Sequence, residues 1–335
     1  MARPVSNPPN PWASEHVELL GEPPDAELQV YEEQARSILS ENDSPDLPFR
    51  WSLNPYRGCF HGCSYCYARP GHQYLGWGAG TDFERRIVAK TNAAERLRAQ
   101  FERRSWRGER IAFSGVTDCY QPLEASYGLT RACLEVCRDY RNPIVLISKG
   151  ALVRRDVDLL AQIAERADAV VYLSIPFADD ALAGALEPWA SPVSKRFEAL
   201  EALSAAGVTT GVSLAPLVPG LNESDIPAIL ERARDCGARH AFQILLRLPA
   251  EVEDVFRQRL EEALPGHARK VFSALADMRG GQRGGFGQRM VGQGSRWKVV
   301  EDLFRVHCRR LGLGDREVQQ REVNSFQRPG DLFPG

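Results

Sequence analysis

The sequence predicts an α/β fold built around a parallel sheet, and two observations support this prediction. Five apolar runs rich in β-branched residues alternate with amphipathic stretches that are long enough for helices. A further strand is expected where the regular pattern begins, in the segment FRWSLNPY. Strand and helix in alternation imply right-handed crossovers and a parallel sheet, at whose carboxyl edge ligands collect. Periodicity alone leaves open whether the sheet is flat or curled into a partial or full barrel.

The ends of these elements are marked by residues with local conformational preferences. Ser191 before Pro192 predicts a helix start with the serine as N-cap, and Gly207 and Gly237 predict left-handed helix ends. The later strands are expected over residues 110–116, 143–149, 169–175, 208–217 and 240–248. The helices between them are expected over residues 91–104, 125–140, 155–167, 192–206 and 225–236.

Composition divides the chain into three parts. Residues 1–48 are rich in proline and acidic, which predicts a partly disordered arm with one short helix around 27–39. Residues 49–250 hold the repeating strand–helix pattern and form the predicted barrel core. Residues 251–335 are expected to be a helical extension with a loop rich in Gly and Arg. Its helices are expected over 251–263, 267–278 and 295–311.

Charge and cysteine content narrow the classes of function. A formal net charge of −2 over 335 residues gives no global signal for nucleic-acid binding. The chain has no apolar run of the roughly 18 residues that predict a membrane span, and no signal peptide is recognisable. Eight cysteines without an export signal favour the reducing cytoplasm and metal or redox chemistry over disulfides.

Three of these cysteines are grouped directly after the first predicted strand. Cys59, Cys63 and Cys66 have the spacing C-x3-C-x2-C. One interpretation is a structural zinc site with His61, His72 or a distant cysteine as fourth ligand, although such sites usually pair two C-x2-C motifs. The other is a cubane iron–sulfur cluster held by three thiolates, whose fourth iron is open to an exogenous ligand. S-adenosylmethionine suits that iron, because its amino and carboxylate groups can chelate it.

The motif C-x3-C-x-aromatic-C, with Tyr65 as the aromatic residue, resembles the signature of the radical S-adenosylmethionine (radical SAM) enzymes. The segments SLNPYRGC, YARP, TDCYQPLE, LISK, LAPLVPGLN and LLRLP resemble the branch related to spore photoproduct lyase, whose bacterial members are often called DNA-repair-photolyase-like. This resemblance extends over about residues 35 to 310. It implies a partial parallel (β/α)6 barrel of radical SAM type with an N-terminal arm and a helical C-terminal extension.

The same resemblance implies the cofactors. A [4Fe-4S] cluster on Cys59, Cys63 and Cys66 would reductively cleave S-adenosylmethionine to a 5'-deoxyadenosyl radical. The electron would come from a partner of the flavodoxin or ferredoxin type. Lys149 and Ser174, at the ends of the third and fourth strands, match positions that contact the cosubstrate in spore photoproduct lyase.

A polar turn after the second strand is a further candidate for the cosubstrate site. Ser114, Thr117 and Asp118 lie where other family members place a Gly-rich segment against the methionine amino group. The alternative is that this segment is a strand-ending turn, and that Lys149 is a solvated residue at the rim of the sheet.

The hydrogen-atom donor is harder to place. Cys119 is a candidate, since a thiol can donate a hydrogen atom to a substrate radical. The cysteine that does so in spore photoproduct lyase matches Gly115 here, so the donor is missing or displaced. Tyr120, Tyr67 and Tyr74 are alternative relays, although buried tyrosines more often serve packing.

Basic residues are concentrated near the end of the chain. Residues 279–310 hold eight Arg or Lys against two acids, which suits either phosphate contact or a loop that neutralises nearby acids. Arg247, at the end of the last expected strand, is a candidate for binding a substrate carboxylate or phosphate, or for pairing with Asp118 or Glu124.

Two functions follow as hypotheses. The first is a cytoplasmic radical SAM enzyme that abstracts hydrogen from an unidentified substrate, with a nucleic-acid lesion as one candidate. The second is a nucleic-acid-binding protein whose zinc or iron–sulfur site is structural.

Overall fold

The structure is a computed structural model that describes residues 7–8, 10–11, 27–280, 289–314 and 324–330. Parts of the predicted N-terminal arm (1–6, 9 and 12–26) and of the Gly/Arg-rich loop (281–288) therefore lie outside the described residues. The division of the chain into three parts stays a prediction. Within the described ranges, no helix combines the length and the apolar character that crossing a membrane requires.

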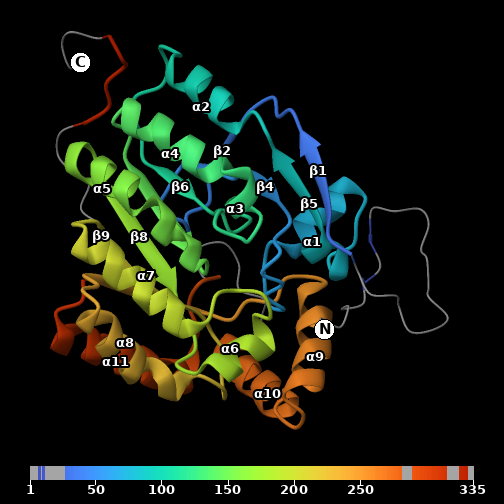
Figure 1. The fold of residues 1–335 in the computed structure, drawn as a ribbon. Helices are drawn as coiled ribbons and strands as arrows, with labels where there is room; N and C mark the ends of the chain where they lie inside the picture. The colour runs from blue at the N-terminus through green and yellow to red at the C-terminus, as the bar shows by residue number, and fades with distance from the viewer. Residues whose placement is uncertain (1–6, 9, 12–26, 281–288, 315–323, 331–335) are drawn as a thin grey trace.

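A seven-stranded sheet in the order β10-β9-β8-β7-β6-β3-β2 forms the centre of the molecule (Figure 1). Six of its strands pair in parallel, and β2 joins antiparallel to β3. The predicted α/β fold with six parallel strands is thereby confirmed. In the described residues β2 and β10 are the two edges, so the sheet is open. The strands are β2 Leu39–Glu41, β3 Trp51–Leu53, β6 Ile111–Phe113, β7 Ile144–Ser148, β8 Ala169–Ser174, β9 Thr209–Leu217 and β10 His240–Leu245.

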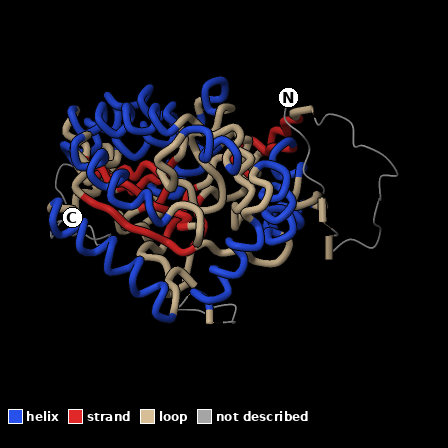
Figure 2. Tube along the Cα trace, turned by 90° about the horizontal axis from the view of Figure 1, so that it is seen from below, coloured by secondary structure: helices blue, strands red, loops and turns tan. Residues whose placement is uncertain are grey.

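Helices lie around the central strands (Figure 2). Every residue of β8 is buried, as expected for a parallel strand that is covered on both faces. Successive helices α2, α4, α5, α7 and α8 pack against one another in chain order, and α7 also packs on β8 and β9. The helices of this layer are α2 Ala93–Phe101, α4 Leu129–Asp139, α5 Val157–Arg166, α7 Val193–Ala205 and α8 Ile226–Asp235. Shorter helical segments are η1 Arg69–Leu75, α1 Thr81–Arg85, α3 Glu124–Tyr127, η2 Ala151–Asp156, α6 Asp180–Leu186 and η3 Glu223–Asp225.

The predicted helix ends are partly right. Gly207 and Gly237 have φ values of +82° and +90°, so both adopt the expected left-handed conformation. The predicted N-cap at Ser191 is wrong, because its hydroxyl accepts a hydrogen bond from the Ala151 amide instead. Asp180 replaces it and accepts from the first free amide of α7, that of Val193, at 2.5 Å.

A second, three-stranded sheet lies beside the first and was not expected from the sequence. Strand β5 (Arg86–Lys90) pairs in parallel with β1 (Gln29–Glu33) and antiparallel with β4 (Tyr56–Arg57). The helix predicted around 27–39 is therefore wrong. Its apolar residues serve strands, since Val30 pairs with Ile87 and packs on the small core of this sheet.

The C-terminal region is helical, as predicted. It consists of α9 (Val252–Ala263), α10 (Ala268–Arg279) and α11 (Gly294–Leu311). Helix α11 packs on α8 and on α10, while α9 packs on α6 and α10. The extension is thus continuous with the helix layer and reaches the region beyond the carboxyl end of β10.

Candidate active site

The three cysteines of the motif lie in one loop between β4 and η1. Cys59 and Cys63 are buried, Cys66 is half-buried, and all three are free thiols. Two glycines shape the loop: Gly58 and Gly62 have φ values of +77° and +66°. A side chain at Gly58 would also place its Cβ 2.9 Å from the carbonyl oxygen of Phe83, so the residue before Cys59 must be glycine.

A buried arginine fixes the shape of this loop. Arg69 is 0% exposed, and its guanidinium donates to the carbonyl oxygens of Cys63, Gly62, Ala79 and Gly80 at 2.8 to 3.1 Å. Glu84 balances its charge through a contact of 2.5 Å. A buried charge needs both a counter-charge and hydrogen bonds. Here all three guanidinium nitrogens donate hydrogen bonds, and Glu84 supplies the counter-charge.

The cysteine loop fits a cluster bound by three thiolates. Burial, the largest cause, raises the pKa of Cys63 well above its usual range, and the neighbouring thiols Cys59 and Cys66 act in the same direction. Burial and then Cys59 raise the pKa of Cys66. The three thiols are therefore close enough to influence one another, and a bound metal cluster would stabilise their thiolate forms. Within the described residues, no group of three or more Cys, His, Asp or Glu converges on a point that could hold a single metal ion.

The aromatic residue of the motif connects the loop to a buried ion pair. The Tyr65 hydroxyl donates to Glu187, whose other carboxylate oxygen lies 2.5 Å from Nη2 of Arg196. Arg196 and Glu187 are 1% and 2% exposed. Arg196 also donates to the carbonyl oxygen of Ser174 at 2.9 Å, so the cysteine loop, helix α7 and the end of β8 are joined.

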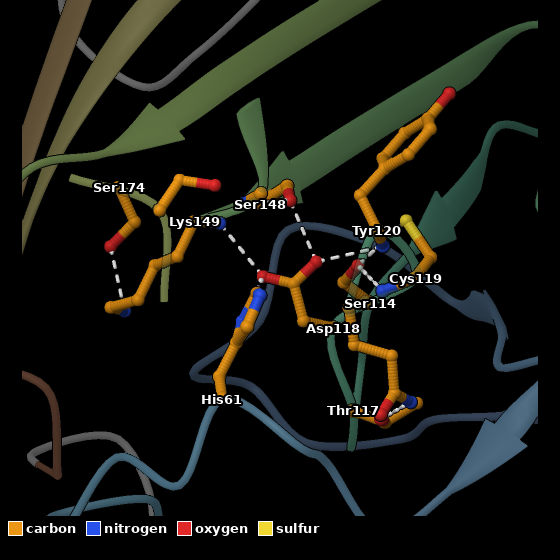
Figure 3. Close-up of polar contacts among 12 residues, drawn as sticks. His61, Ser114, Thr117, Asp118, Cys119, Tyr120, Ser148, Lys149 and Ser174 are labelled. Carbon is orange, nitrogen blue, oxygen red and sulfur yellow. Dashed lines mark hydrogen bonds and ion pairs between the residues drawn. The ribbon is translucent and has the colours of Figure 1, made fainter. Parts of the chain in front are cut away.

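Lys149 and Ser174 lie together at the carboxyl edge of the sheet (Figure 3). Strands β7 and β8 pair with Ser148 opposite Leu173, so the next residues of the two strands are also neighbours. The Lys149 ammonium donates to the Ser174 hydroxyl at 2.9 Å and lies 5.6 Å from the centre of the Tyr65 ring. Glu187 is 3.9 Å from the same ammonium. This places a cation and a hydroxyl beside the cysteine loop.

Asp118 lies in the turn that follows β6 and bonds to the end of β7 (Figure 3). Its carboxylate accepts from the Ser148 hydroxyl at 2.6 Å and from the Lys149 amide at 2.7 Å, and it lies 3.3 Å from Nδ1 of His61. Burial acts to raise the pKa of Asp118, but His61 and these hydrogen bonds hold it well below its usual range. For His61, burial acts to lower the pKa, but the charge of Asp118 prevails and raises it to about 10.

Ser114 and Thr117 also form bonds within the turn. The Ser114 hydroxyl bonds to the thiol and the amide of Cys119 at 3.0 and 3.1 Å, and its backbone has a φ of +77°. The Thr117 hydroxyl donates to the carbonyl oxygen of Gly58 at 2.6 Å, which ties the turn to the cysteine loop. Of the five residues predicted for the cosubstrate, Lys149 and Ser174 come together, whereas the turn residues hold the loops in place.

The predicted catalytic roles of Cys119 and Tyr120 are not supported by their positions. Cys119 is 0% exposed and belongs to the main core. Tyr120 points away from Lys149 and Ser174 in Figure 3, and its hydroxyl donates to Asp156 at 2.9 Å. Both side chains belong to the main hydrophobic core.

The fold is an α/β fold with an open parallel sheet, and the candidate site lies at the carboxyl edge of that sheet. Comparison with known proteins gives the family. The model of the radical SAM superfamily matches residues 53–233, a little more than half of the chain. The chain therefore belongs to the radical SAM superfamily. This family implies a [4Fe-4S] cluster and S-adenosylmethionine, and it indicates an enzyme.

Relatives and solved structures agree with this assignment. An uncharacterized protein of Mycobacterium tuberculosis is 39% identical over 53% of this chain and 52% of its own length, so the chain spans about half the length of that relative. A radical SAM Nalpha-GlyT isomerase of Pseudomonas phage M6 is 25% identical over 66% of this chain and 44% of its own length. Spore photoproduct lyase complexed with dinucleoside spore photoproduct is 15% identical, with a TM-score of 0.61 over 89% of this chain and 86% of that chain. At this identity the likeness shows a shared fold.

Proposed function

We propose that this radical SAM enzyme holds a [4Fe-4S] cluster on Cys59, Cys63 and Cys66 and binds S-adenosylmethionine at Lys149 and Ser174. The observation that supports this is the position of three free thiols in one loop, next to a lysine–serine pair at the carboxyl edge of the sheet. Cys59, Cys63 and Cys66 would hold the cluster, which when bound would supply the electron for reductive cleavage of S-adenosylmethionine and so the radical chemistry of the family.

The residues of the chain bind and orient the reactants. The Lys149 ammonium attracts the cosubstrate carboxylate, and the Ser174 hydroxyl offers a polar contact to carboxylate or ribose. Asp118 accepts from the Lys149 amide, so it fixes the backbone from which this ammonium extends. Ser114 and Thr117 keep the turn closed against the cysteine loop and act as positioning residues.

A nucleic-acid lesion is the proposed substrate class. Support comes from spore photoproduct lyase, which shares the fold and whose structure contains a dinucleoside spore photoproduct. The phage relative, a radical SAM isomerase, supports a radical rearrangement as the kind of reaction. A reducing partner of the flavodoxin or ferredoxin type is proposed as the electron donor.

Substitution of Lys149 tests the cosubstrate site. Lys149→Ala should weaken S-adenosylmethionine binding roughly 10- to 100-fold, since charge-assisted hydrogen bonds contribute about 1.5–3 kcal/mol. The iron content of the reconstituted protein should not change, because the cysteines are untouched. Affinity is measured by calorimetry and iron by colorimetry, with Lys195→Ala, in an exposed pair with Glu198, as the matched control. Unchanged affinity in Lys149→Ala would contradict the assignment.

A further inference from the structure

A group of arginines lies beyond the carboxyl end of β10, outside the cosubstrate site. Arg247 follows this strand, Arg279 ends helix α10, and Arg289 precedes helix α11. These guanidinium groups are close enough to repel one another. The charge of Arg289 lowers the pKa of Arg247, and the charge of Arg247 lowers the pKa of Arg279. Asp46 is the acid among the neighbours of Arg247. Among the described residues, positive charge therefore predominates around Arg247.

Two of these arginines have structural partners. Arg289 donates to Asp46 at 2.7 Å and to the Ser44 hydroxyl at 2.5 Å, which anchors the segment before β3. Arg279 donates to the carbonyl oxygens of Leu246 at 2.7 Å and of Arg289 at 3.0 Å. Arg279 thus holds the end of β10 in place, whereas Arg289 joins the residues before α11 to the segment before β3.

Arg247 differs from these two. It is half-buried, and among the described residues no hydrogen bond or ion pair holds its guanidinium. The predicted pairing with Asp118 or Glu124 is absent, because Asp118 lies against His61 and Glu124 contacts Arg155 at 2.6 Å. Burial, followed by the charge of Arg289, lowers the pKa of Arg247. A half-buried cation beside another cation is unfavourable unless an anion joins it.

The position of Arg247 connects it with the proposed chemistry. Tyr67 directly follows the last cysteine of the motif and is an electrostatic neighbour of Arg247. The Tyr67 hydroxyl donates to the carbonyl oxygen of Gly115 at 2.5 Å, at the end of the second parallel strand. Arg247 therefore lies at the same edge of the sheet as the cysteine loop, on the side of β10.

We propose that Arg247 binds a phosphate group of the substrate and so selects a phosphate-bearing substrate. This inference rests on the proposed function, since it assumes that the substrate reacts at this edge. Phosphate suits the site because Arg247 is half-buried without a hydrogen bond or ion pair among the described residues, and because a guanidinium binds phosphate oxygens in bidentate fashion. The phosphate can belong to a nucleic-acid backbone or to a small phosphorylated molecule.

Binding of defined probes to the reconstituted protein tests this proposal. The probes are inorganic phosphate, thymidylyl-thymidine, its neutral methylphosphonate analogue and a short single-stranded oligonucleotide, measured by calorimetry. Arg247→Ala should weaken binding of the charged probes roughly 10- to 100-fold, as expected for the loss of charge-assisted hydrogen bonds. Arg247→Lys should be intermediate. Arg257→Ala, which removes an exposed arginine of α9, should bind like the wild type.

The outcomes separate the two phosphate sources and the two proposals. Tight binding of the oligonucleotide that depends on Arg247 identifies nucleic acid, whereas comparable binding of inorganic phosphate identifies a small molecule. Failure of every probe to bind, equal binding of the methylphosphonate, or wild-type binding by Arg247→Ala would each overturn the inference. Unfolding should be unchanged in Arg247→Ala, because the guanidinium has no partner within the described residues. Formation of 5'-deoxyadenosine is assayed separately, so failure of the proposed function is recognised independently.

Discussion

Replacement of Glu187 by leucine is predicted to destabilise the protein strongly, although this residue belongs to no recognisable motif. The carboxylate is 2% exposed and lies 2.5 Å from Arg196, which is 1% exposed. It also accepts from the Tyr65 hydroxyl. Glu187→Leu would therefore leave both a buried guanidinium and a buried phenol without this partner.

The structure sets the size of this effect. Breaking a buried ion pair by removing one partner costs about 3–5 kcal/mol. Arg196 keeps hydrogen bonds to the carbonyl oxygens of Ser174 at 2.9 Å and Ser191 at 2.7 Å, which partly compensate its charge. The lost Tyr65 bond adds to the cost, so we expect a loss of about 4 kcal/mol in the free energy of unfolding. The whole free energy of unfolding of a protein is typically about 5–15 kcal/mol, so this loss is large.

Urea unfolding of the cluster-free protein, followed by circular dichroism, measures this loss. The double variant Glu187→Leu/Arg196→Met removes both charges and should be more stable than Glu187→Leu alone. Glu198→Gln, in an exposed ion pair, serves as control and should unfold like the wild type. Iron bound after reconstitution should fall in Glu187→Leu, because Tyr65 lies within the cysteine loop. A decrease of less than about 1 kcal/mol in the free energy of unfolding would refute this prediction, because the loss of one partner of a buried ion pair costs more than that.

Two further predictions concern residues outside this pair. Lys90 is buried, and burial lowers its pKa from 10.5 to about 8; the unfolded chain therefore binds more protons between these values, and stability rises with pH there. The free energy of unfolding of the wild type should accordingly rise by about 2–3 kcal/mol relative to that of Lys90→Met between neutral pH and pH ~10. A difference between the two proteins in urea unfolding that does not depend on pH would contradict this. Cys119 should resist iodoacetamide until the cluster-free protein unfolds, because it is buried and burial raises its pKa, whereas half-buried Cys236 should react earlier. Equal labelling of the two by mass spectrometry would show that Cys119 is open to the site.

The main sheet was predictable because its strands carry strong local signals. Continuous apolar runs such as the fully buried β8 and well-marked helix ends such as Gly207 depend on neighbouring residues alone. The second sheet was missed because β4 is only two residues long and because β1 is stabilised by pairing with β5, far away in the chain. Such pairing leaves no periodic pattern that can be read locally.

The same contrast holds for the site. The cysteine spacing and the strand-ending position of Lys149 point to the site directly in the sequence. The partners Arg69 and Glu187 were not foreseen, because their roles arise from tertiary contacts with residues that are distant in sequence or lack a motif. The burial of Cys119 was likewise not foreseen, because it arises from packing against residues of the main core that are distant in sequence.

The most direct test of the central claim is electron paramagnetic resonance of the anaerobically reconstituted, dithionite-reduced protein, recorded with and without S-adenosylmethionine. If the cysteine loop holds the proposed cluster, we expect a cubane-cluster signal that shifts when S-adenosylmethionine is added and is accompanied by 5'-deoxyadenosine. A signal that S-adenosylmethionine leaves unchanged, without nucleoside formation, would contradict it.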